Sequence, residues 1–346
     1  MPERLLEVEG LQVSFATEEG LVRAVDGVSF TLDRGEVVAI VGESGSGKSV
    51  SVMTLMGLTR SPNARFGGTA LLGDRELISA SEEDLEDVRG REIAMIFQDP
   101  IASLSPVHRV GHQIAEQIRA HEKVSKAEAL DRAITLMERV GIPRAKDRSR
   151  AYPHEFSGGM RQRVMIAMAL SLSPSVLIAD EPTTALDVTI QAQILTEIGQ
   201  LSREFNSGVI FVTHDLGVVA DIADRVLVMY GGRLVEQGTV DEIFYNPQHP
   251  YTWGLLGSVP RIDRDPPPRL PAIPGQPPSL SSVPEGCHFR PRCPHAFDRC
   301  VEVPVLEARV ENEPGHEDRC WLSPADKLTL REVDGRIGLG KKVAAE

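Results

Sequence analysis

The segment 42–49 reads Gly-Glu-Ser-Gly-Ser-Gly-Lys-Ser and constrains the fold of this chain more than any other feature. It follows an apolar run that ends at Val41, and such runs are typical of strands covered on both faces of a parallel sheet. A strand, a glycine-rich turn and a helix that begins with lysine and serine form a phosphate-binding loop. The glycines let successive backbone N–H groups point at phosphate oxygens. The sequence therefore predicts an α/β domain that binds a nucleotide.

Two adjacent carboxylates, Asp180 and Glu181, follow a second apolar run at residues 176–179. The carboxyl ends of strands form the edge at which open α/β sheets bind ligands. Neighbouring residues on a strand point to opposite sides, so we expect Asp180 to face Mg²⁺ and Glu181 to face an attacking water. In the loop, Lys48 would reach the β- and γ-phosphates and Ser49 would hold Mg²⁺.

The rest of the first 260 residues reads as alternating strands and helices. Three further apolar runs predict buried strands, at residues 93–97, 209–212 and 226–229. Residues 5–15 and 28–32 alternate and predict a small antiparallel unit. Helices separate most of the buried strands, and this alternation is typical of an α/β domain.

The length of 346 residues exceeds what one hydrophobic core usually supports, so we expect one large domain and an appendage. Prolines are dense between Pro260 and Pro284 and predict an extended spacer. The predicted organisation is a nucleotide-binding domain over 1–260 with a helical part at about 99–172, a proline-rich linker over 261–284, a four-cysteine extension over 285–322, and a frayed tail over 323–346.

Composition and charge exclude other classes of protein. With 50 acidic and 37 basic residues the net charge is −13, which argues against a chain that wraps nucleic acid. Its apolar runs fall short of the roughly 20 residues of a membrane-spanning helix. The first ten residues carry three glutamates and lack an apolar core, so we expect no signal peptide.

A third motif, Phe-Ser-Gly-Gly-Met at 156–160, predicts a helix start with Ser157 as N-cap. A phosphate loop, a Ser-Gly-Gly helix start and then an Asp-Glu strand resemble, in this order, the ATPase subunits of the ATP-binding cassette (ABC) family, over about residues 5–261. The resemblance implies a P-loop NTPase cassette: a RecA-like parallel core, an antiparallel β-subdomain and a helical subdomain, here with a C-terminal cysteine-containing extension.

The resemblance also implies roles for single residues. Gln98 matches the Q-loop glutamine, Asp187 the D-loop, and His214 the switch histidine that would hold the γ-phosphate. Phe15 stands where an aromatic ring stacks on adenine, although it could equally be a core residue. The loop residues that contact ATP would be Gly42, Ser44, Gly45, Ser46, Gly47, Lys48 and Ser49. The catalytic set would be Glu181, His214 and Gln98, and the Mg²⁺ ligands Ser49, Gln98 and Asp180. Ser157, Gly158 and Gly159 would contact the ATP of a facing cassette.

Phe156 and Met160 depart from the commonest signature, and Met160 resembles the subgroup that imports dipeptides, oligopeptides or nickel. Residues 98–106 and the Asn-Pro-Gln-His-Pro-Tyr-Thr stretch at 246–252 resemble the same subgroup, with Ser105 in place of its usual asparagine. The resemblance implies an ATPase that powers uptake of di- and oligopeptides from the cytoplasmic side of the cell membrane. Its partners would be two transmembrane permease subunits, a second ABC ATPase, identical or homologous, and indirectly an extracytoplasmic solute-binding protein.

Three alternatives remain open at this point. One is an importer of nickel chelates with the same mechanism. Another is a soluble ABC ATPase that acts on nucleic acid, against which the acidic balance counts. The third is a regulatory nucleotide binder without turnover, against which Glu181 and His214 count.

All four cysteines fall late in the chain, at Cys287, Cys293, Cys300 and Cys320. Such clustering favours metal ligation over disulfides, but the paired C-x-x-C of zinc knuckles is absent. Four thiolates suit a [4Fe–4S] cluster or Zn²⁺ equally well by chemistry, and free thiols are the third possibility. The resemblance favours the cluster, because some peptide importers of this subgroup carry one in this extension. Nothing in the sequence places these cysteines near the ATP residues.

Overall fold

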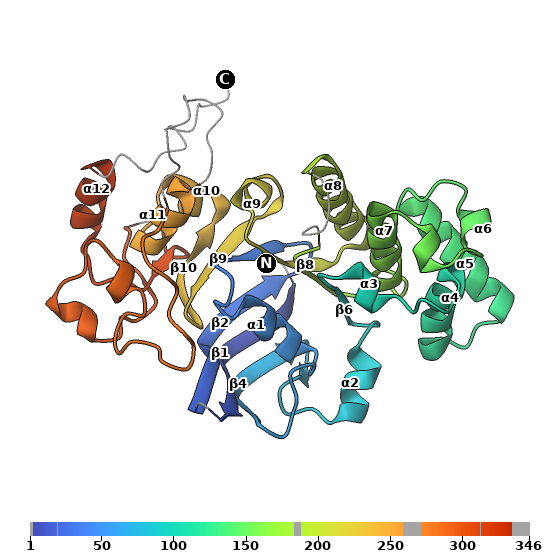
Figure 1. The fold of residues 1–346 in the computed structure, drawn as a ribbon, viewed down its shortest axis with the longest axis horizontal. Coiled ribbons are helices and arrows are strands. Elements are labelled where there is room, and N and C mark those ends of the chain that lie inside the picture. Colours follow the sequence, from blue (N-terminus) through green and yellow to red (C-terminus); the bar gives the residue numbers. More distant parts are fainter. Residues whose placement is uncertain (1–2, 19, 183–187, 259–271, 312, 334–346) are drawn as a thin grey trace. The chain divides into compact units, whose positions relative to one another are not determined.

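The computed structural model describes residues 3–18, 20–182, 188–258, 272–311 and 313–333. The chain folds into two compact units, each built from separate stretches of sequence (Figure 1). The first unit comprises Met1–Glu7, Thr31–Val37 and Leu71–Val212. The second comprises Val8–Phe30, Val38–Ala70 and Thr213–Glu346.

The core of the first unit is a set of parallel strands, β6 (Ile93–Ile96), β7 (Val176–Asp180) and β8 (Gly208–Thr213). Ile93 lies opposite Val176, and Val176 opposite Gly208. Every residue of the three strands is buried. The apolar runs at these positions predicted this arrangement, and the prediction is confirmed.

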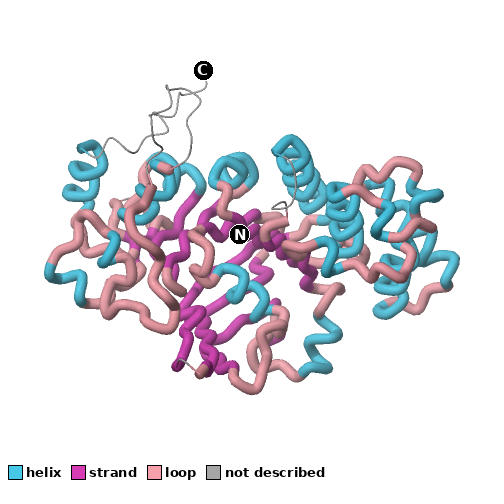
Figure 2. The backbone as a smooth tube through the Cα atoms, viewed as in Figure 1, coloured by secondary structure: helices cyan, strands magenta, loops and turns pink. Residues whose placement is uncertain are grey.

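Helices fill the segment between β6 and β7 (Figure 2). Ser125 begins α5 by accepting a hydrogen bond from the Glu128 N–H at 3.2 Å. The helices of this unit are α2 (Glu82–Val88), α3 (Pro100–Ser103), α4 (Val110–His121), α5 (Lys126–Arg139), α6 (Ala145–Arg148), the 3-10 turn η1 (Pro153–Glu155), α7 (Gly158–Ala169) and α8 (Val188–Phe205).

Two sheets organise the second unit. In the first sheet β1 (Arg4–Thr17) lies between β2 (Gly20–Asp33) and β4 (Ala64–Leu72), and the end of β4 pairs antiparallel with β5 (Arg75–Glu76). In the second sheet the order is β11 (Glu307–Ala308), β12 (Glu317–Asp318), β10 (Arg233–Thr239), β9 (Arg225–Tyr230) and β3 (Val37–Val41). β3 and β9 are parallel.

The helices of this unit are α1 (Lys48–Leu55), α9 (Leu216–Ile222), α10 (Val240–Tyr245), α11 (Pro250–Gly257) and α12 (Pro324–Val333), and its 3-10 turns are η2 (Arg290–Arg292) and η3 (Asp298–Val301).

The four-cysteine segment adds strands β11 and β12 to the sheet of the second unit, with Glu236 of β10 opposite Asp318. This pairing was not predicted, because a strand of two residues leaves no periodic pattern in the sequence. Residues 272–284 of the predicted linker form no helix or strand, and 261–271 lie outside the described residues.

The frayed tail predicted from residue 323 is instead the helix α12 over Pro324–Val333, and residues 334–346 lie outside the described range. Ser323 accepts the N–H of Asp326 at 3.2 Å and caps the helix. Lys327 is 1% exposed, and its ammonium donates to Asp318 at 2.7 Å. The tail was expected to fray because the last residues of a domain are poorly ordered unless they are tied down, and this ion pair ties the segment down.

A buried ionic network attaches the C-terminal residues to β10. Glu236 is fully buried and accepts hydrogen bonds from the backbone N–H groups of Gln248 and His249 and from His316 Nε2, at 2.5, 2.9 and 2.9 Å. His316 Nδ1 lies 2.9 Å from a carboxylate oxygen of Glu313. Because carboxylates only accept, both ring nitrogens carry protons and His316 is an imidazolium. Burial opposes this charge, but Glu236 and Glu313 outweigh it and raise the pKa of His316 to about 9.

A raised pKa makes this network pH-dependent. The stabilisation is complete below the unfolded pKa of about 6.5 and is lost as pH rises through about 9. We expect thermal unfolding and amide exchange of residues 307–333 to show a loss of roughly 3 kcal/mol between pH 6 and pH 9.5. His316→Gln should be destabilised at pH 6 and lose this pH dependence, whereas His154→Gln, at an exposed site, should retain it. Equal wild-type stability at both pH values would contradict the assignment.

Candidate nucleotide-binding site

The phosphate loop in the second unit requires glycine at two positions. Gly42 has φ 151° and Gly47 has φ 101°, both in the region that side chains rarely adopt. A Cβ at Gly42 would lie 2.2 Å from the Met229 carbonyl oxygen, and a Cβ at Gly47 2.3 Å from that of Ala24. The loop therefore packs against neighbouring backbone so closely that only glycine fits.

The polar groups of the loop suit an anion. Lys48 is 5% exposed, and its ammonium donates to the carbonyl oxygens of Gly42 at 2.8 Å and Glu43 at 3.0 Å. The hydroxyl of Ser46 is buried and has no hydrogen-bond partner within the described part of the chain. Ser44 and Gly45 are exposed, and Ser49 is half-buried in the first turn of α1. A helix N-terminus with an ammonium group beside it is a phosphate-binding arrangement.

Two further predicted residues lie in this unit. Phe15 is half-buried on β1. His214 is exposed directly after β8, and the next residue, Asp215, caps α9 by accepting the Gly217 N–H at 2.9 Å. The cap fixes the backbone that presents His214.

In the first unit the structure brings Gln98 and Glu181 together. The Gln98 amide Nε2 donates to a carboxylate oxygen of Glu181 at 2.9 Å. Glu181 has φ 45°, and its N–H donates to the Val212 carbonyl at 2.9 Å. A left-handed conformation at a non-glycine residue costs about 1–3 kcal/mol and clusters at functional sites. Asp180, one residue earlier, is 2% exposed at the end of β7.

The Ser-Gly-Gly motif begins α7 as predicted. Ser157 is the N-cap and accepts the Met160 N–H at 3.4 Å. Ser157 and Gly158 are exposed, and Gly159 is half-buried, while Phe156 is 3% exposed. Phe156, which differs from the commonest signature, is thus a core residue, and the start of α7 stays exposed to solvent. Asp187 lies outside the described residues.

Comparison with known proteins agrees with this geometry. Residues 25–184 match the family model described as ABC transporter, and residues 235–300 match the model for the C-terminal region of oligopeptide/dipeptide transporters. The chain is 52% identical to the oligopeptide transport ATP-binding protein OppD of Salmonella typhimurium, over 94% of this chain and 95% of that one. It is 50% identical to the dipeptide transport ATP-binding protein DppD of Lactococcus lactis, over 95% and 96% of the two chains. The chain belongs to the ABC transporter family.

The cassette fold is also confirmed by a solved structure. The dimeric ATP-binding cassette MJ0796, bound to ADP and phosphate, superimposes with a TM-score of 0.61. The match covers 68% of this chain and 99% of that one at 24% identity. At that identity the likeness shows the fold alone.

The four cysteines of this ABC chain line a single small cavity, together with His249, Phe289, His295 and Trp321. All four are free thiols, and Cys300 and Cys320 are buried. Burial raises the pKa of Cys293 and of Cys320 to about 12, and neighbouring thiols act in the same direction. In the part of the chain described, no three of the sulfur atoms lie mutually within 4.8 Å.

Two residues that support the phosphate loop of this cassette were not predicted from the sequence. The Glu43 N–H donates to the Tyr251 hydroxyl at 2.8 Å, and the Glu43 carboxylate binds Arg292. Tyr251 lies in the His-Pro-Tyr stretch that the resemblance used, so a signal for it existed. Arg292 is 249 residues from Glu43, and no local pattern links them.

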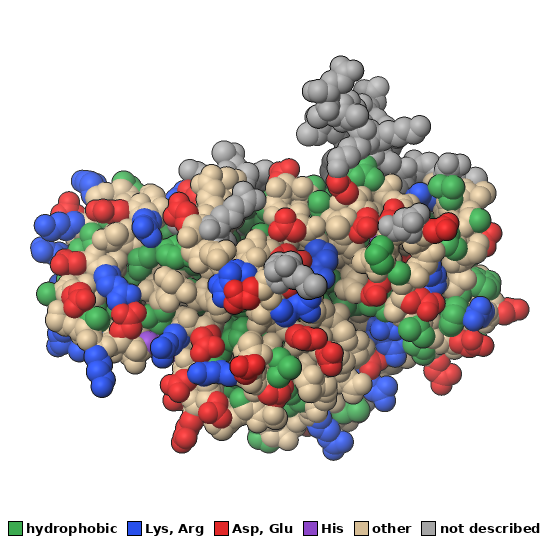
Figure 3. Space-filling model, turned by 180° about the vertical axis from the view of Figure 1, so that it is seen from behind, with side chains coloured by type: hydrophobic (Ala, Val, Ile, Leu, Met, Phe, Trp, Pro, Cys, Tyr) green, Lys and Arg blue, Asp and Glu red, His purple; other side chains and the backbone are tan. Residues whose placement is uncertain are grey.

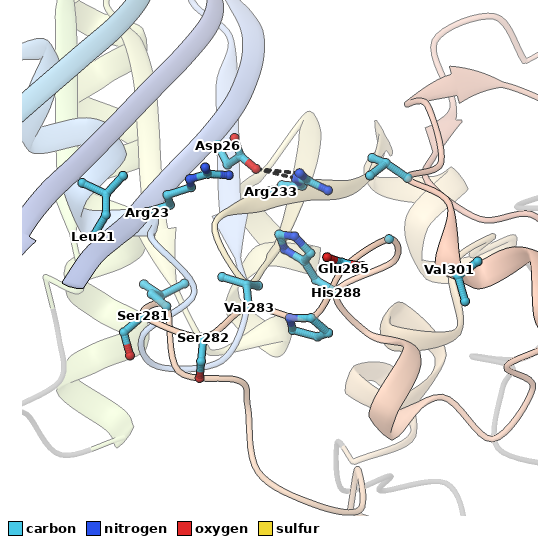
Figure 4. A pocket seen from close by; sticks show the side chains of 14 residues that line it. Leu21, Arg23, Asp26, Arg233, Ser281, Ser282, Val283, Glu285, His288 and Val301 are labelled. Atoms are coloured by element: carbon cyan, nitrogen blue, oxygen red, sulfur yellow. Dashed lines mark hydrogen bonds and ion pairs between the residues drawn. The ribbon is translucent and has the colours of Figure 1, made fainter. Parts of the chain in front are cut away.

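A cavity of about 530 Å³ is lined by residues of β2, by Arg233 at the start of β10, and by residues 280–286, His288, Val301 and Val303 (Figure 4). Arg233 and Asp26 form an ion pair of 2.7 Å on its wall, and His288 also lines it. Its lining includes no residue of the phosphate loop, so it is not the nucleotide site.

Acidic and basic side chains are interspersed over the face drawn in Figure 3. Among the residues that the structure describes, no helix has both the length and the apolar character of a membrane span.

Proposed function

We propose that this chain is the ATP-hydrolysing subunit of an ABC importer that powers uptake of di- and oligopeptides across the cytoplasmic membrane. The observation that carries the proposal is the match of one chain to both the cassette and the peptide-transporter C-terminal region. Relatives named for oligopeptide and dipeptide transport share about half of its residues over nearly their whole length. Nickel chelates and nucleic acid have no comparable support.

Binding of ATP begins at the phosphate loop. Lys48 would move its ammonium from the loop carbonyls to the β- and γ-phosphates, and the backbone N–H groups of the loop would hold the remaining oxygens. Phe15 would stack on the adenine. The hydroxyl, amide and carboxylate oxygens of Ser49, Gln98 and Asp180 suit Mg²⁺, which prefers oxygen ligands. Mg²⁺, when bound, neutralises charge that develops on the phosphates.

Hydrolysis transfers the γ-phosphoryl group to water. The water oxygen forms a bond to the γ-phosphorus while the bond to the β–γ bridging oxygen breaks, which yields ADP and phosphate. Glu181 orients this water and receives its proton, since the strained backbone at Glu181 and the Gln98 hydrogen bond fix its carboxylate. His214 would hold the γ-phosphate.

The importer requires further subunits. The open start of α7 supports contact of Ser157, Gly158 and Gly159 with ATP bound by a second cassette, identical or homologous, and we place Asp187 at the same interface. We place docking to two transmembrane permease subunits at the helical segment after β6, where Val107, in the loop between α3 and α4, is 73% exposed. The protein would thus be peripheral, on the cytoplasmic side of the membrane, and meet a solute-binding protein only indirectly.

We also propose that Cys287, Cys293, Cys300 and Cys320 hold a [4Fe–4S] cluster. Four thiols and no carboxylate around one apolar cavity form a soft ligand set that fits an iron–sulfur cluster. A tetrahedral Zn²⁺ with bonds of about 2.3 Å would bring its sulfurs to about 3.8 Å from one another. The resemblance to peptide importers that carry a cluster in this extension supports iron–sulfur over zinc, since the four thiols suit both by chemistry.

We expect Glu181→Gln to retain ATP binding and lose at least about 100-fold in turnover, because the amide cannot accept the proton. Lys48→Ala should instead lose ATP affinity, since its charge contacts the phosphates. Steady-state phosphate release and direct binding of an ATP analogue measure the two effects. Glu138→Gln, exposed on α5, should behave as the wild type. Turnover of Glu181→Gln within threefold of wild type would refute the role of Glu181.

We expect the chain to purify from detergent-solubilised membranes with two hydrophobic subunits when they are expressed together. Val107→Asp should weaken this complex, because a carboxylate in an apolar contact is left without a partner. Leu58→Asp, at another exposed apolar position, is the matched control. Recovery with nucleic acid instead of membrane subunits would favour the alternative function.

We expect protein purified without oxygen to be brown and to contain about four iron and four sulfide per chain. Cys293→Ser should lose the colour and make residues after Pro284 sensitive to protease. His295→Gln should keep the colour and leave these residues resistant to protease. One zinc per chain without colour would establish the zinc site. Four titratable thiols without metal would remove the site.

A further inference from the structure

The segment between the first two cysteines contacts the support of the phosphate loop. This segment, residues 287–293, is called the cysteine bridge below. Three of its side chains are buried: His288 is 9% exposed, Phe289 2% and Arg292 8%. Each reaches toward the phosphate loop or toward a residue that holds it.

Arg292 makes the most direct of these contacts. Its guanidinium binds both carboxylate oxygens of Glu43, at 2.5 and 3.0 Å. It is itself held in place, because Nε donates to the Pro274 carbonyl at 2.9 Å and Nη1 to the Tyr230 hydroxyl at 3.3 Å. A bidentate pair fixes both the distance and the orientation of the carboxylate. The side chain of Glu43 therefore has one defined direction.

The backbone of Glu43 carries this restraint to Lys48. The Glu43 N–H donates to the Tyr251 hydroxyl at 2.8 Å, and the Glu43 carbonyl accepts from the Lys48 ammonium at 3.0 Å. Tyr251 is fully buried and packs on Tyr230 and Phe289, with ring centroids 4.5 and 5.4 Å apart. Arg292 and Tyr251 thus hold one residue of the loop from two sides, and that residue contacts Lys48.

A second route runs through the turn between β9 and β10. His288 Nδ1 donates to the Gly231 carbonyl at 2.8 Å, and the Gly232 N–H donates to the Ser46 carbonyl at 3.0 Å. Figure 4 shows His288 beside this turn. The cysteine bridge therefore reaches the loop at Glu43 directly and at Ser46 through the turn.

We propose that Arg292 is a positioning residue for ATP: from the C-terminal segment it orients the Glu43 peptide and neutralises its carboxylate, so that Lys48 and the loop are set to receive the phosphates. The inference rests on the proposed function, in which the loop binds ATP. Without Arg292, the Glu43 carboxylate lies unpaired on a loop that must accept a highly charged anion, and repulsion adds to the lost orientation.

The test measures ATP affinity and turnover separately in purified, folded protein. We expect Arg292→Gln to weaken binding of a non-hydrolysable ATP analogue about tenfold or more, with kcat at saturating ATP changed less than about threefold. Glu43→Gln should have a smaller effect, because it removes the repulsive charge together with the ion pair. The double variant should resemble Glu43→Gln alone, since the pair acts as one unit.

Controls separate positioning from general stability. Arg319→Gln is matched, because Arg319 also adjoins a cysteine and donates to two backbone carbonyls, those of Leu234 and Pro304. It should leave ATP affinity unchanged. If Arg292→Gln does not fold, Tyr251→Phe removes only the hydroxyl that accepts the Glu43 N–H and should weaken ATP binding severalfold.

Three results would overturn the proposal. One is unchanged ATP affinity in folded Arg292→Gln and Tyr251→Phe. Another is additive losses of affinity in the double variant, and the third is equal losses in Arg319→Gln. A wild-type protein that binds no ATP would refute the proposed function itself, and that result is distinguished by the wild-type measurement alone.

Discussion

The ion pair between Glu43 and Arg292 connects two stretches of the second unit that are far apart in the sequence, Val38–Ala70 and Thr213–Glu346. Glu43 follows the first buried strand of the nucleotide-binding sheet, and Arg292 lies between two cysteines 249 residues later. The guanidinium is 6% exposed and the carboxylate 26%, so solvent screens the pair weakly. Loss of either partner would leave a charge beside the phosphate loop, and a buried charge without its partner is strongly destabilising. The C-terminal segment is thus part of the structure that forms the ATP site.

This connection changes the interpretation of the cysteine cavity. In the sequence, the four cysteines lie in a C-terminal extension, and nothing places them near the residues that bind ATP. In the structure, Cys287 and Cys293 enclose the residues that support the loop, and β12 extends the sheet that carries β9. A group bound by the thiols would fix both ends of the cysteine bridge, and therefore the position from which Arg292 reaches Glu43. If Arg292 positions the loop as we propose, the stability of the extension and the affinity for ATP are coupled through residues 287–293.

Much of the fold could be predicted from the sequence, because its signals are local. Buried parallel strands are continuous apolar runs, as at Val176–Asp180, and helix starts carry caps, as at Ser125 and Ser157. The glycines of the loop indicate positions where the backbone adopts a positive φ, which other residues rarely do. Gln98 and Glu181 were predicted to cooperate only through the resemblance, and the hydrogen bond between them agrees with it.

The missed features share a physical cause, which is that each depends on a contact between distant segments. The pairing of β10 with β12 and the ion pairs of Lys327 and His316 leave no trace in local periodicity. The C-terminal position predicted a frayed segment, whereas the buried ammonium of Lys327 binds Asp318. Arg292 belongs to the same class, because its carboxylate partner, Glu43, lies 249 residues away in the sequence. In this cassette the local motifs are visible in the sequence, whereas the ion pair that holds Glu43 of the phosphate loop is visible only in the structure.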